Sequence, residues 1–404
     1  MRLKEICDYI SRGTTPEYVD ESPYKVMNQA TFSKGWLDES NIRYTSKNVC
    51  EAQIKKGDLL MASTGGGVLG KVFFYDSDDT SFYADSHVSI LRNSKKKNLM
   101  KYLYYFFSIK YDEINATMVK GSTNQTELQR NYLLAYELNI PSLYKQQRIV
   151  DYLDAQLSEI NRRVSVLEKE LDAYARLKKS IIHQAVTRGL NPDIRLKDSG
   201  IDGIGMIPEH WEIKRIKELC PFVNRGTTPD YVDESNYKVM NQAVFSTGRL
   251  NLDIVRYSSY MKQEAQIKKG DLLIASTGGG VLGKLYFFDD DEVFYADSHV
   301  TIVRNNKNPF IVKFLFYYFS IAFDMINACF AKGSTNQTEL QKEKLIAYEL
   351  AVPTYEEQQQ IIIFLDEKCS KIDAAIENIG KQIEASMRLK KAIINEAISG
   401  KAPI

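Results

Sequence analysis

Apolar residues recur at helical spacing in two long segments, one after Pro141 and one after Pro353. In the first segment they are Ile149, Leu153, Leu157, Ile160, Val164, Leu167 and Leu171. From Leu157 the spacing alternates between three and four residues, which is typical of a coiled-coil seam. The pattern returns 212 residues later at Ile361, Leu365, Cys369, Ile372, Ile376, Ile379 and Ile383.

This pattern predicts two long helices, at residues 143–189 and 355–400, with Gly189 and Gly400 as stops. A helix with an apolar seam needs a partner, and each helix supplies one for the other. We expect antiparallel pairing, because a parallel pair would force the linker at residues 190–210 to run back about 60 Å. Antiparallel pairing also brings the two chain termini together.

The segments before the helices, residues 1–142 and 211–354, mix short apolar runs with turns. Strands are predicted at Asp58–Met61, Val72–Tyr75 and His87–Leu91, and a helix at Leu99–Ile114. We interpret each segment as an α/β domain. The whole chain is then α+β, with two α/β domains separated by two long helices that form an antiparallel coiled coil.

Internal repeats show that the domains are copies of one another. Arg12–Pro16 recurs as Arg225–Pro229, and Ala52–Lys71 recurs as Ala265–Lys284 with only Met61 replaced, by Ile274. Two further repeated segments are Phe82–His87 with Phe294–His299, and Lys120–Gln129 with Lys332–Gln341. A period of about 212 residues is too long for a solenoid and indicates a duplicated pair, a pseudo-two-fold internal repeat.

Composition narrows the functional classes. The net charge is +1, so any surface that binds nucleic acid must be local, or a partner must help. Five cysteines without a C-x-x-C pair, and only four histidines, argue against a zinc site and a disulfide framework. The N-terminus lacks the apolar core of a signal peptide, and the most apolar stretch is too short to span a bilayer. We therefore expect a cytoplasmic protein.

Three short motifs resemble sequence motifs of enzymes. Gly65–Lys71 and Gly278–Lys284 fit G-x-x-x-x-G-K, but a Val or Leu follows the lysine where a P-loop needs Ser or Thr, and a strand follows instead of a helix. A nuclease-like Pro-Asp and Glu-x-Lys pattern lies in the linker near Glu212 and has no second copy. Asp85-x-His87 and its copy lack a third ligand or a nucleophile, so a hydrogen-bonded histidine is the favoured interpretation, with DNA contact as the alternative.

Three polar loops, at Arg12–Tyr18, Asn28–Gln29 and Lys120–Gln125, favour nucleic-acid contact, because amides and guanidinium groups can pair with base edges and hydroxyls with phosphates. The third loop is expected to precede a helix that starts at Thr126. An alternative role for each residue is that of a turn or cap. The candidate DNA-binding residues of the first domain are Arg12, Thr14, Thr15, Tyr18, Asn28, Gln29, Thr64, Gly65, Gly66, Lys71, His87, Lys120, Ser122, Thr123, Asn124 and Gln125. Those of the second are Arg225, Thr227, Thr228, Tyr231, Asn241, Gln242, Thr277, Gly278, Gly279, Lys284, His299, Lys332, Ser334, Thr335, Asn336 and Gln337.

Longer segments carry a family resemblance over the whole chain. They are Gln146–Leu153, Arg176–Leu190 and Ser199–Trp211, and the first two recur as Gln358–Leu365 and Arg388–Lys401. With them the chain resembles the specificity subunit of type I restriction–modification enzymes. One departure is that the first domain has no counterpart of Ile207–Trp211 and is expected to be shorter at its lead-in strand.

The resemblance implies a subunit without catalysis, metal or cofactor of its own. Its globular parts would be target recognition domains and its helices spacers. It implies two methyltransferase subunits as partners, which bind S-adenosylmethionine, and ATP- and Mg²⁺-dependent restriction–translocase subunits in the larger complex. It also implies a bipartite double-stranded DNA target, and two similar domains then predict a near-palindromic one with a gap of about 5–8 base pairs. Alternatives are a solitary DNA-binding protein, a DNA-modifying enzyme and a structural scaffold.

Overall fold

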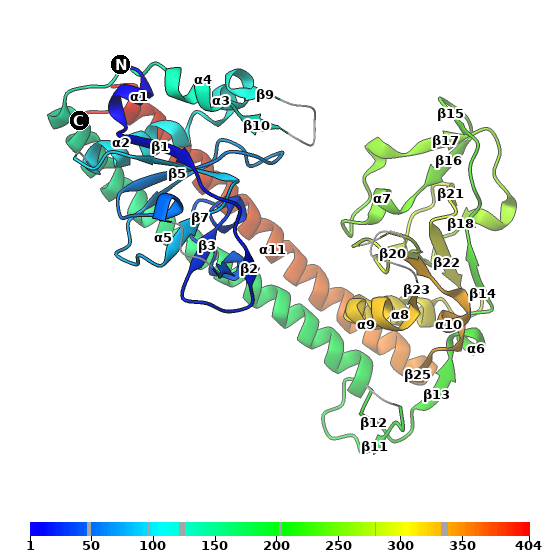
Figure 1. The fold of residues 1–404 in the computed structure, drawn as a ribbon. Helices are drawn as coiled ribbons and strands as arrows, with labels where there is room; N and C mark the ends of the chain where they lie inside the picture. Colours follow the sequence, from blue (N-terminus) through cyan, green and yellow to red (C-terminus); the bar gives the residue numbers. More distant parts are fainter. Residues whose placement is uncertain (47–49, 96, 121–125, 202–203, 279, 333–337) are drawn as a thin grey trace. The chain divides into compact units, whose positions relative to one another are not determined.

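The computed structural model describes residues 1–46, 50–95, 97–120, 126–201, 204–278, 280–332 and 338–404. The chain forms two compact units. Unit 1 comprises Met1–Glu168 with Lys381–Ile404, and unit 2 comprises Lys169–Gly380. Each unit therefore contains one globular domain and a part of both long helices (Figure 1).

The domain of unit 1 is built on two sheets. The first has the order β1-β8-β5-β6 and is antiparallel, and the second has the order β2-β4-β3-β7, with β3 and β7 parallel. Their strands are β1 (Tyr9–Arg12), β8 (Val88–Arg92), β5 (Asp58–Ala62), β6 (Val72–Tyr75), β2 (Tyr18–Val19), β4 (Arg43–Thr45), β3 (Lys25–Met27) and β7 (Phe82–Ala84). A buried cluster that includes Met27, Leu60 and Ile90 joins the two sheets.

Short elements complete this domain. A hairpin pairs β9 (Val119–Lys120) with β10 (Glu127–Leu128). The helices are α1 (Leu3–Ile6), α2 (Lys97–Ser108), α3 (Tyr111–Thr117) and α4 (Arg130–Ala135), and the 3-10 helices are η1 (Gln29–Thr31), η2 (Glu39–Asn41) and η3 (Cys50–Ala52). The three predicted strands are found as β5, β6 and β8 within one residue of their expected bounds.

Two local predictions were wrong. The stretch Leu99–Ile114 is divided between two helices, because α2 ends at Ser108 and a separate α3 begins after Lys110, which occupies its N-cap position. Thr126 does not start a helix. The residues after it pair with β9 as β10, and α4 begins only at Arg130.

Unit 2 repeats these elements. One sheet has the order β14-β22-β19-β20 and the other β15-β17-β16-β21-β18. The strands are β14 (Phe222–Arg225), β22 (Val300–Arg304), β19 (Asp271–Ala275), β20 (Leu285–Phe288), β15 (Tyr231–Val232), β17 (Arg256–Ser258), β16 (Tyr237–Met240), β21 (Phe294–Ala296) and β18 (Gln266–Ile267), with the hairpin β23 (Ala331–Lys332) and β24 (Glu339–Leu340). The helices are α6 (Ile216–Leu219), α7 (Gln242–Phe245), η4 (Leu252–Ile254), η5 (Gln263–Ala265), α8 (Pro309–Ser320), α9 (Phe323–Phe330) and α10 (Lys342–Ala347).

The two units differ at the lead-in to the domain. In unit 2 a linker hairpin of β11 (Leu196–Asp198) and β12 (Met206–Pro208) precedes β13 (Glu212–Arg215), which pairs with β25 (Glu349–Val352). Trp211, next to β13, is fully buried and packs edge-to-face on Phe314. In unit 1 a single bridge between Arg2 and Glu137 takes the place of the β13–β25 ladder.

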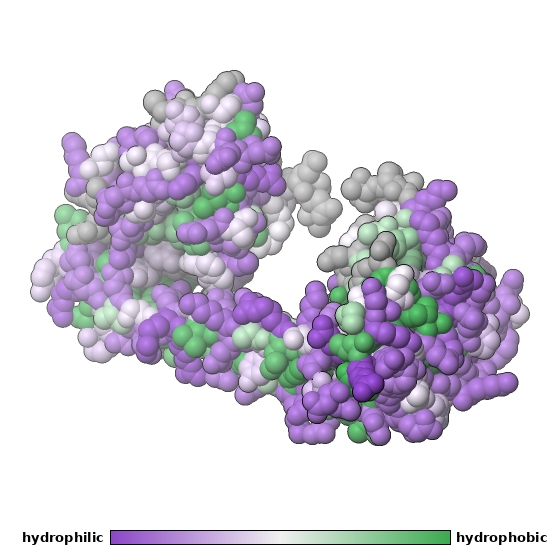
Figure 2. Space-filling view, turned by 90° about the horizontal axis from the view of Figure 1, so that it is seen from below, coloured by the Kyte–Doolittle hydropathy of each residue, from purple (hydrophilic) through white to green (hydrophobic). Residues whose placement is uncertain are grey.

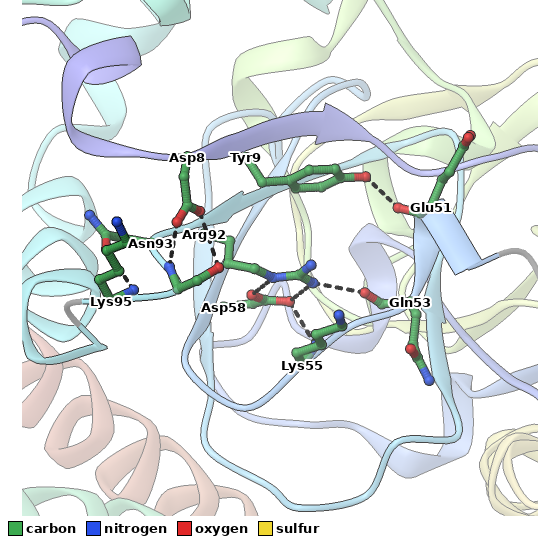
Figure 3. A network of polar contacts seen from close by, with 10 residues as sticks. Asp8, Tyr9, Glu51, Gln53, Lys55, Asp58, Arg92, Asn93 and Lys95 are labelled. Carbon is green, nitrogen blue, oxygen red and sulfur yellow. Dashed lines mark hydrogen bonds and ion pairs between the residues drawn. The ribbon is translucent and has the colours of Figure 1, made fainter.

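A buried ion pair joins two central strands of each domain. In unit 1 the Arg92 guanidinium donates to both Asp58 carboxylate oxygens at 2.6 Å, and also to the Gln53 carbonyl oxygen (Figure 3). The Lys55 amide donates to the same carboxylate at 2.7 Å. Arg304 and Asp271 repeat the pair in unit 2, where burial raises the pKa of Asp271 and the Arg304 hydrogen bonds oppose that rise.

The long helices are α5 (Leu143–Arg188) and α11 (Tyr355–Ile398). Each begins two residues after a proline, whose carbonyl oxygen accepts a hydrogen bond from a buried glutamine, Gln146 or Gln358. Because proline has fixed φ and no N–H, it fits just ahead of a helix. Gly189 follows the end of α5 with φ +74°, a conformation that glycine adopts without strain.

Within each unit the two helices run antiparallel, as predicted. In unit 1 the Lys390 ammonium of α11 donates to the Asn161 amide oxygen of α5 at 2.8 Å. In unit 2 Lys178 of α5 donates to both carboxylate oxygens of Asp373 of α11, at 2.7 and 2.6 Å. Late residues of one helix therefore meet early residues of the other. The predicted seam is buried or partly buried along both helices.

One carboxylate ties each domain to its long helix. Asp154 of α5 accepts hydrogen bonds from the Lys101 ammonium at 2.7 Å and the Tyr105 hydroxyl at 2.5 Å, both from α2. Asp366 of α11 accepts from Lys313 and Tyr317 of α8 at the same distances. The domains thus share polar contacts as well as a core with the helices.

The surface of the chain is mainly polar on the face drawn in Figure 2. Figure 2 shows one face of the molecule, on which hydrophilic residues predominate and hydrophobic ones form separate patches. Among the described residues, no helix combines the length and apolar character required to cross a membrane.

The buried ion pair yields a stability prediction. Asp58→Asn removes the charge opposite Arg92, and we expect the first domain to lose about 3–5 kcal/mol, because an uncompensated buried charge remains. Urea unfolding, combined with hydrogen exchange of the β5 amides, measures this loss. The control is Asp78→Asn, which removes the exposed partner of Lys56 and should change stability little. Equal losses for the two variants would contradict the assignment.

Candidate nucleic-acid interface

The candidate residues of unit 1 gather where several strands end. Thr14 follows β1, Asn28 follows β3, Thr64 lies just after β5, and His87 lies between β7 and β8. Backbone bridges join Thr14 to Asp85 and Thr64 to Glu127, so β10 of the hairpin joins the same place. The sheet topology therefore brings loops that are far apart in sequence into one cluster, which we call the strand-end cluster.

A threonine and a histidine form the centre of the cluster. The Thr64 hydroxyl and His87 Nδ1 lie 2.6 Å apart, and the His87 amide donates to the Asp85 carboxylate at 2.8 Å. Asp85 is only 2% exposed, and burial raises its pKa, although the His87 amide works in the opposite direction. The aspartate thus fixes the turn that presents the imidazole, which agrees with the interpretation of a hydrogen-bonded histidine.

Unit 2 repeats this geometry. Thr277 and His299 Nδ1 lie 2.7 Å apart, and the His299 amide donates to Asp297 at 2.8 Å. Gln242 approaches the same threonine at 3.5 Å. Burial again raises the pKa of the aspartate. Both domains therefore present the same hydroxyl, imidazole and amide groups.

An arginine is held beside each cluster by the hairpin. Arg12 forms an ion pair with Glu127 of β10, and Arg225 forms one with Glu339 of β24. The Arg225 guanidinium also donates to the Ser276 carbonyl oxygen at 3.2 Å. Sequence reasoning missed both glutamates as functional neighbours, although each lies inside a repeated segment.

A second arginine, also missed, stacks on the tyrosine of the first polar loop. The Arg43 guanidinium lies 5.2 Å from the centre of the Tyr18 ring, and Arg256 lies 3.4 Å from that of Tyr231. Such cation–π contacts orient a guanidinium while leaving its N–H groups available. The signal in the sequence was the recurrence of Arg-Tyr at Arg43 and Arg256, 213 residues apart.

The asparagines of the second polar loop act as helix caps. The Asn28 side-chain oxygen accepts from the Ala30 and Thr31 amides at 2.8 and 3.3 Å, and Asn241 accepts from Ala243 at 2.9 Å. Because these oxygens are engaged, each asparagine keeps only its amide nitrogen free of this cap. Gln29 and Gln242 beside them are limited in the same way, because the Gln29 side-chain oxygen is buried and the Gln242 oxygen accepts from the Thr277 hydroxyl at 3.5 Å.

Several candidate residues lie elsewhere or outside the described residues. Lys71 and Lys284 line grooves together with residues of the long helices, away from the polar loops. Thr15, Thr228 and Gly66 are exposed, and Lys332 is exposed on β23. For Lys120 only the backbone, in β9, is described. Outside the described residues lie Ser122, Thr123, Asn124, Gln125, Gly279, Ser334, Thr335, Asn336 and Gln337.

Comparisons with known proteins identify the class. Residues 1–168 and 208–385 match the family model of the type I restriction modification DNA specificity domain. The chain is 22% identical over 414 residues to the type I restriction enzyme MjaVIII specificity subunit of Methanocaldococcus jannaschii, covering 99% of this chain and 92% of that protein. It is also 22% identical over 352 residues to a putative specificity subunit, S.HindORF215P, of Haemophilus influenzae, covering 86% and 85%.

A solved structure agrees with the fold. It is described as "Structural basis underlying complex assembly and conformational transition of the type I R-M system". It matches with a TM-score of 0.63 and 17% identity, over 100% of this chain and 97% of that one. The class of protein is therefore that of the type I DNA-specificity subunits. The chain belongs to the family of type I restriction–modification DNA specificity domains.

A glycine next to the cluster gives a testable prediction. A Cβ on Gly13 would lie 2.1 Å from the Ala84 carbonyl oxygen. The position directly after β1 therefore has no room for a side chain. We expect Gly13→Ala to destabilise the first domain by about 3 kcal/mol, because backbone must move. Gly67→Ala, which meets open space at φ +81°, should cost only about 1 kcal/mol. Hydrogen exchange of the β1 and β7 amides measures both, and similar losses would refute the close approach.

Proposed function

We propose that this specificity subunit reads a near-palindromic bipartite DNA target, one half-site with each strand-end cluster. The main support is that the two clusters carry the same groups in the same contacts: Thr64–His87 and Thr277–His299, and the stacked arginines on both tyrosines. Two domains with the same reading groups should favour nearly the same bases.

Within each strand-end cluster, the chemistry of a side chain indicates which part of the DNA it would contact. The Gln29 amide nitrogen and the His87 imidazole are groups suited to base edges in the major groove, with Thr64 orienting the imidazole. Arg12, and Arg43 on Tyr18, offer guanidinium groups suited to phosphates or guanine. The net charge of +1 gives no general attraction to DNA, so contact depends on these local groups and on partners.

We further propose that the chain docks two methyltransferase subunits, and that restriction–translocase subunits join the larger complex. S-adenosylmethionine, ATP and Mg²⁺ would then be bound by those partners. The match to a structure described in terms of type I complex assembly supports this proposal. The long helices α5 and α11 would act as the spacer. Half-site centres about one turn of B-DNA apart, roughly 34 Å, correspond to a gap of about 5–8 base pairs.

Mapping of modified bases tests the target. The chain is expressed with its methyltransferase partner, and methylated adenines are mapped across the host genome. We expect an inverted repeat with a gap of about 5–8 base pairs. A target whose halves differ at most positions would contradict the proposal, and so would methylation that does not depend on this chain.

Matched threonine variants test the equivalence of the clusters. Thr64→Val and Thr277→Val remove the hydroxyl beside each histidine with little change in volume. We expect each to weaken binding of the mapped target by roughly tenfold, and the double variant by roughly one hundredfold. Affinity for a scrambled duplex should stay unchanged. Thr80→Val, in an exposed loop, is the control, and a large difference between the two single variants would refute equivalent reading.

A further inference from the structure

A groove in unit 1 lies between the globular domain and the parts of α5 and α11 that belong to the same unit. Its volume is about 640 Å³. Apolar walls come from Trp36, Tyr104, Phe107, Met387 and Ile394. Trp36 and Met387 are 40% and 42% exposed, so apolar surface faces solvent there. We call it the unit 1 groove.

Charge in the unit 1 groove is mostly positive. Among the described residues that line it, Glu168 is the acidic one, and the basic ones are Lys34, Lys71, Arg388, Lys390 and Lys391. Lys34 is paired with Asp38 at 2.9 Å, and Lys391 lies 3.8 Å from Asp112. Lys390 differs, because the hydrogen bond from its ammonium goes to the neutral amide oxygen of Asn161.

The duplication supplies a matched comparison. Lys178 of unit 2 is the equivalent of Lys390, 212 residues earlier, and it also lines a groove beside its domain. Its partner is the Asp373 carboxylate, which stands where unit 1 has Asn161. Unit 2 therefore neutralises its lysine internally, whereas unit 1 gives it only a neutral amide.

A second difference lies in the same groove. Trp36 of unit 1 corresponds to Arg249 of unit 2, which forms an ion pair with Glu377 at 3.3 Å. The unit 2 groove is also smaller, about 500 Å³, and its described lining includes the acids Asp289 and Asp366. In unit 2 the equivalent lysine and the residue equivalent to Trp36 are thus both in internal ion pairs, whereas in unit 1 an apolar wall adjoins a lysine that faces a neutral amide.

An external anion would complete the unit 1 groove. An ammonium group has three N–H donors, of which Asn161 takes one. Burial lowers the pKa of Lys390, so the charged form is held at a cost that a counter-ion would remove. A volume of this size with apolar walls is typical of small-molecule sites, in which a charged side chain fixes the orientation of the ligand.

We propose that the unit 1 groove binds a small amphipathic anion, with its carboxylate on the Lys390 ammonium and its apolar body against Trp36 and Met387. The carboxylate would take the place that Asp373 has beside Lys178. The site is separate from the strand-end clusters, and the proposal does not depend on which DNA is read.

Trp36 provides a direct readout. The chain has two tryptophans, and the other, Trp211, is fully buried in unit 2, so it adds a constant background. The full-length chain is titrated with octanoate, and with 1-octanol as the neutral compound of equal length. We expect octanoate to change Trp36 emission in a saturable manner, and octanol to bind roughly tenfold more weakly. Equal binding of both compounds, or no response to octanoate, would overturn the proposal.

Two matched variants locate the site. Asn161→Asp gives Lys390 the counter-ion that Lys178 already has, and should weaken octanoate binding by roughly tenfold without unfolding the chain. Asp373→Asn makes the reciprocal change in unit 2 and should leave the Trp36 response unchanged. Lys390→Met should abolish the preference of the groove for octanoate over octanol. If Asn161→Asp binds octanoate as tightly as the unchanged chain, the anion is not on Lys390 and the proposal is wrong.

Discussion

Burial of the apolar seams of α5 and α11 is the constraint on which the rest of the structure depends. Helices of 46 and 44 residues gain most of their stability in a protein from packing of an apolar face. In unit 1 Leu153 of α5 and Ile394 of α11 belong to the same core as the domain, and in unit 2 Ile182 and Leu365 do. Both long helices therefore contribute side chains to the core of each domain.

This shared core explains how the candidate DNA-binding groups are positioned. Asp154 and Asp366 hold α2 and α8 to the long helices. In turn, α2 and α8 pack on the first sheet of their own domain. The strand-end cluster lies at the ends of strands in that sheet and the adjoining one. The candidate groups lie on loops, and the strands that flank these loops belong to sheets packed on the helical frame of the same unit.

Local patterns predicted the frame well. The helix boundaries follow from Pro141, Gly189 and their copies, and the strands β5, β6 and β8 from short apolar runs. Long-range pairing could not be predicted in the same way. Arg12 meets Glu127 across 115 residues, and no periodicity marks that contact. The residues after Thr126 form a strand because they pair with the neighbouring β9 as a hairpin, although their sequence resembles a helix start.

Comparison of the two copies separates the contacts that both units share from those that differ between the units. The buried pair Arg92–Asp58, the Thr–His contact and the aspartate anchor occur in both units, so a common architecture accounts for them. The difference between Asp373 and Asn161 is of another kind. The equivalent lysines are both partly buried, but one faces a carboxylate and the other a neutral amide, so the common fold does not determine this contact. A partly buried ammonium without a carboxylate partner is stabilised where an external charge takes the place of that partner.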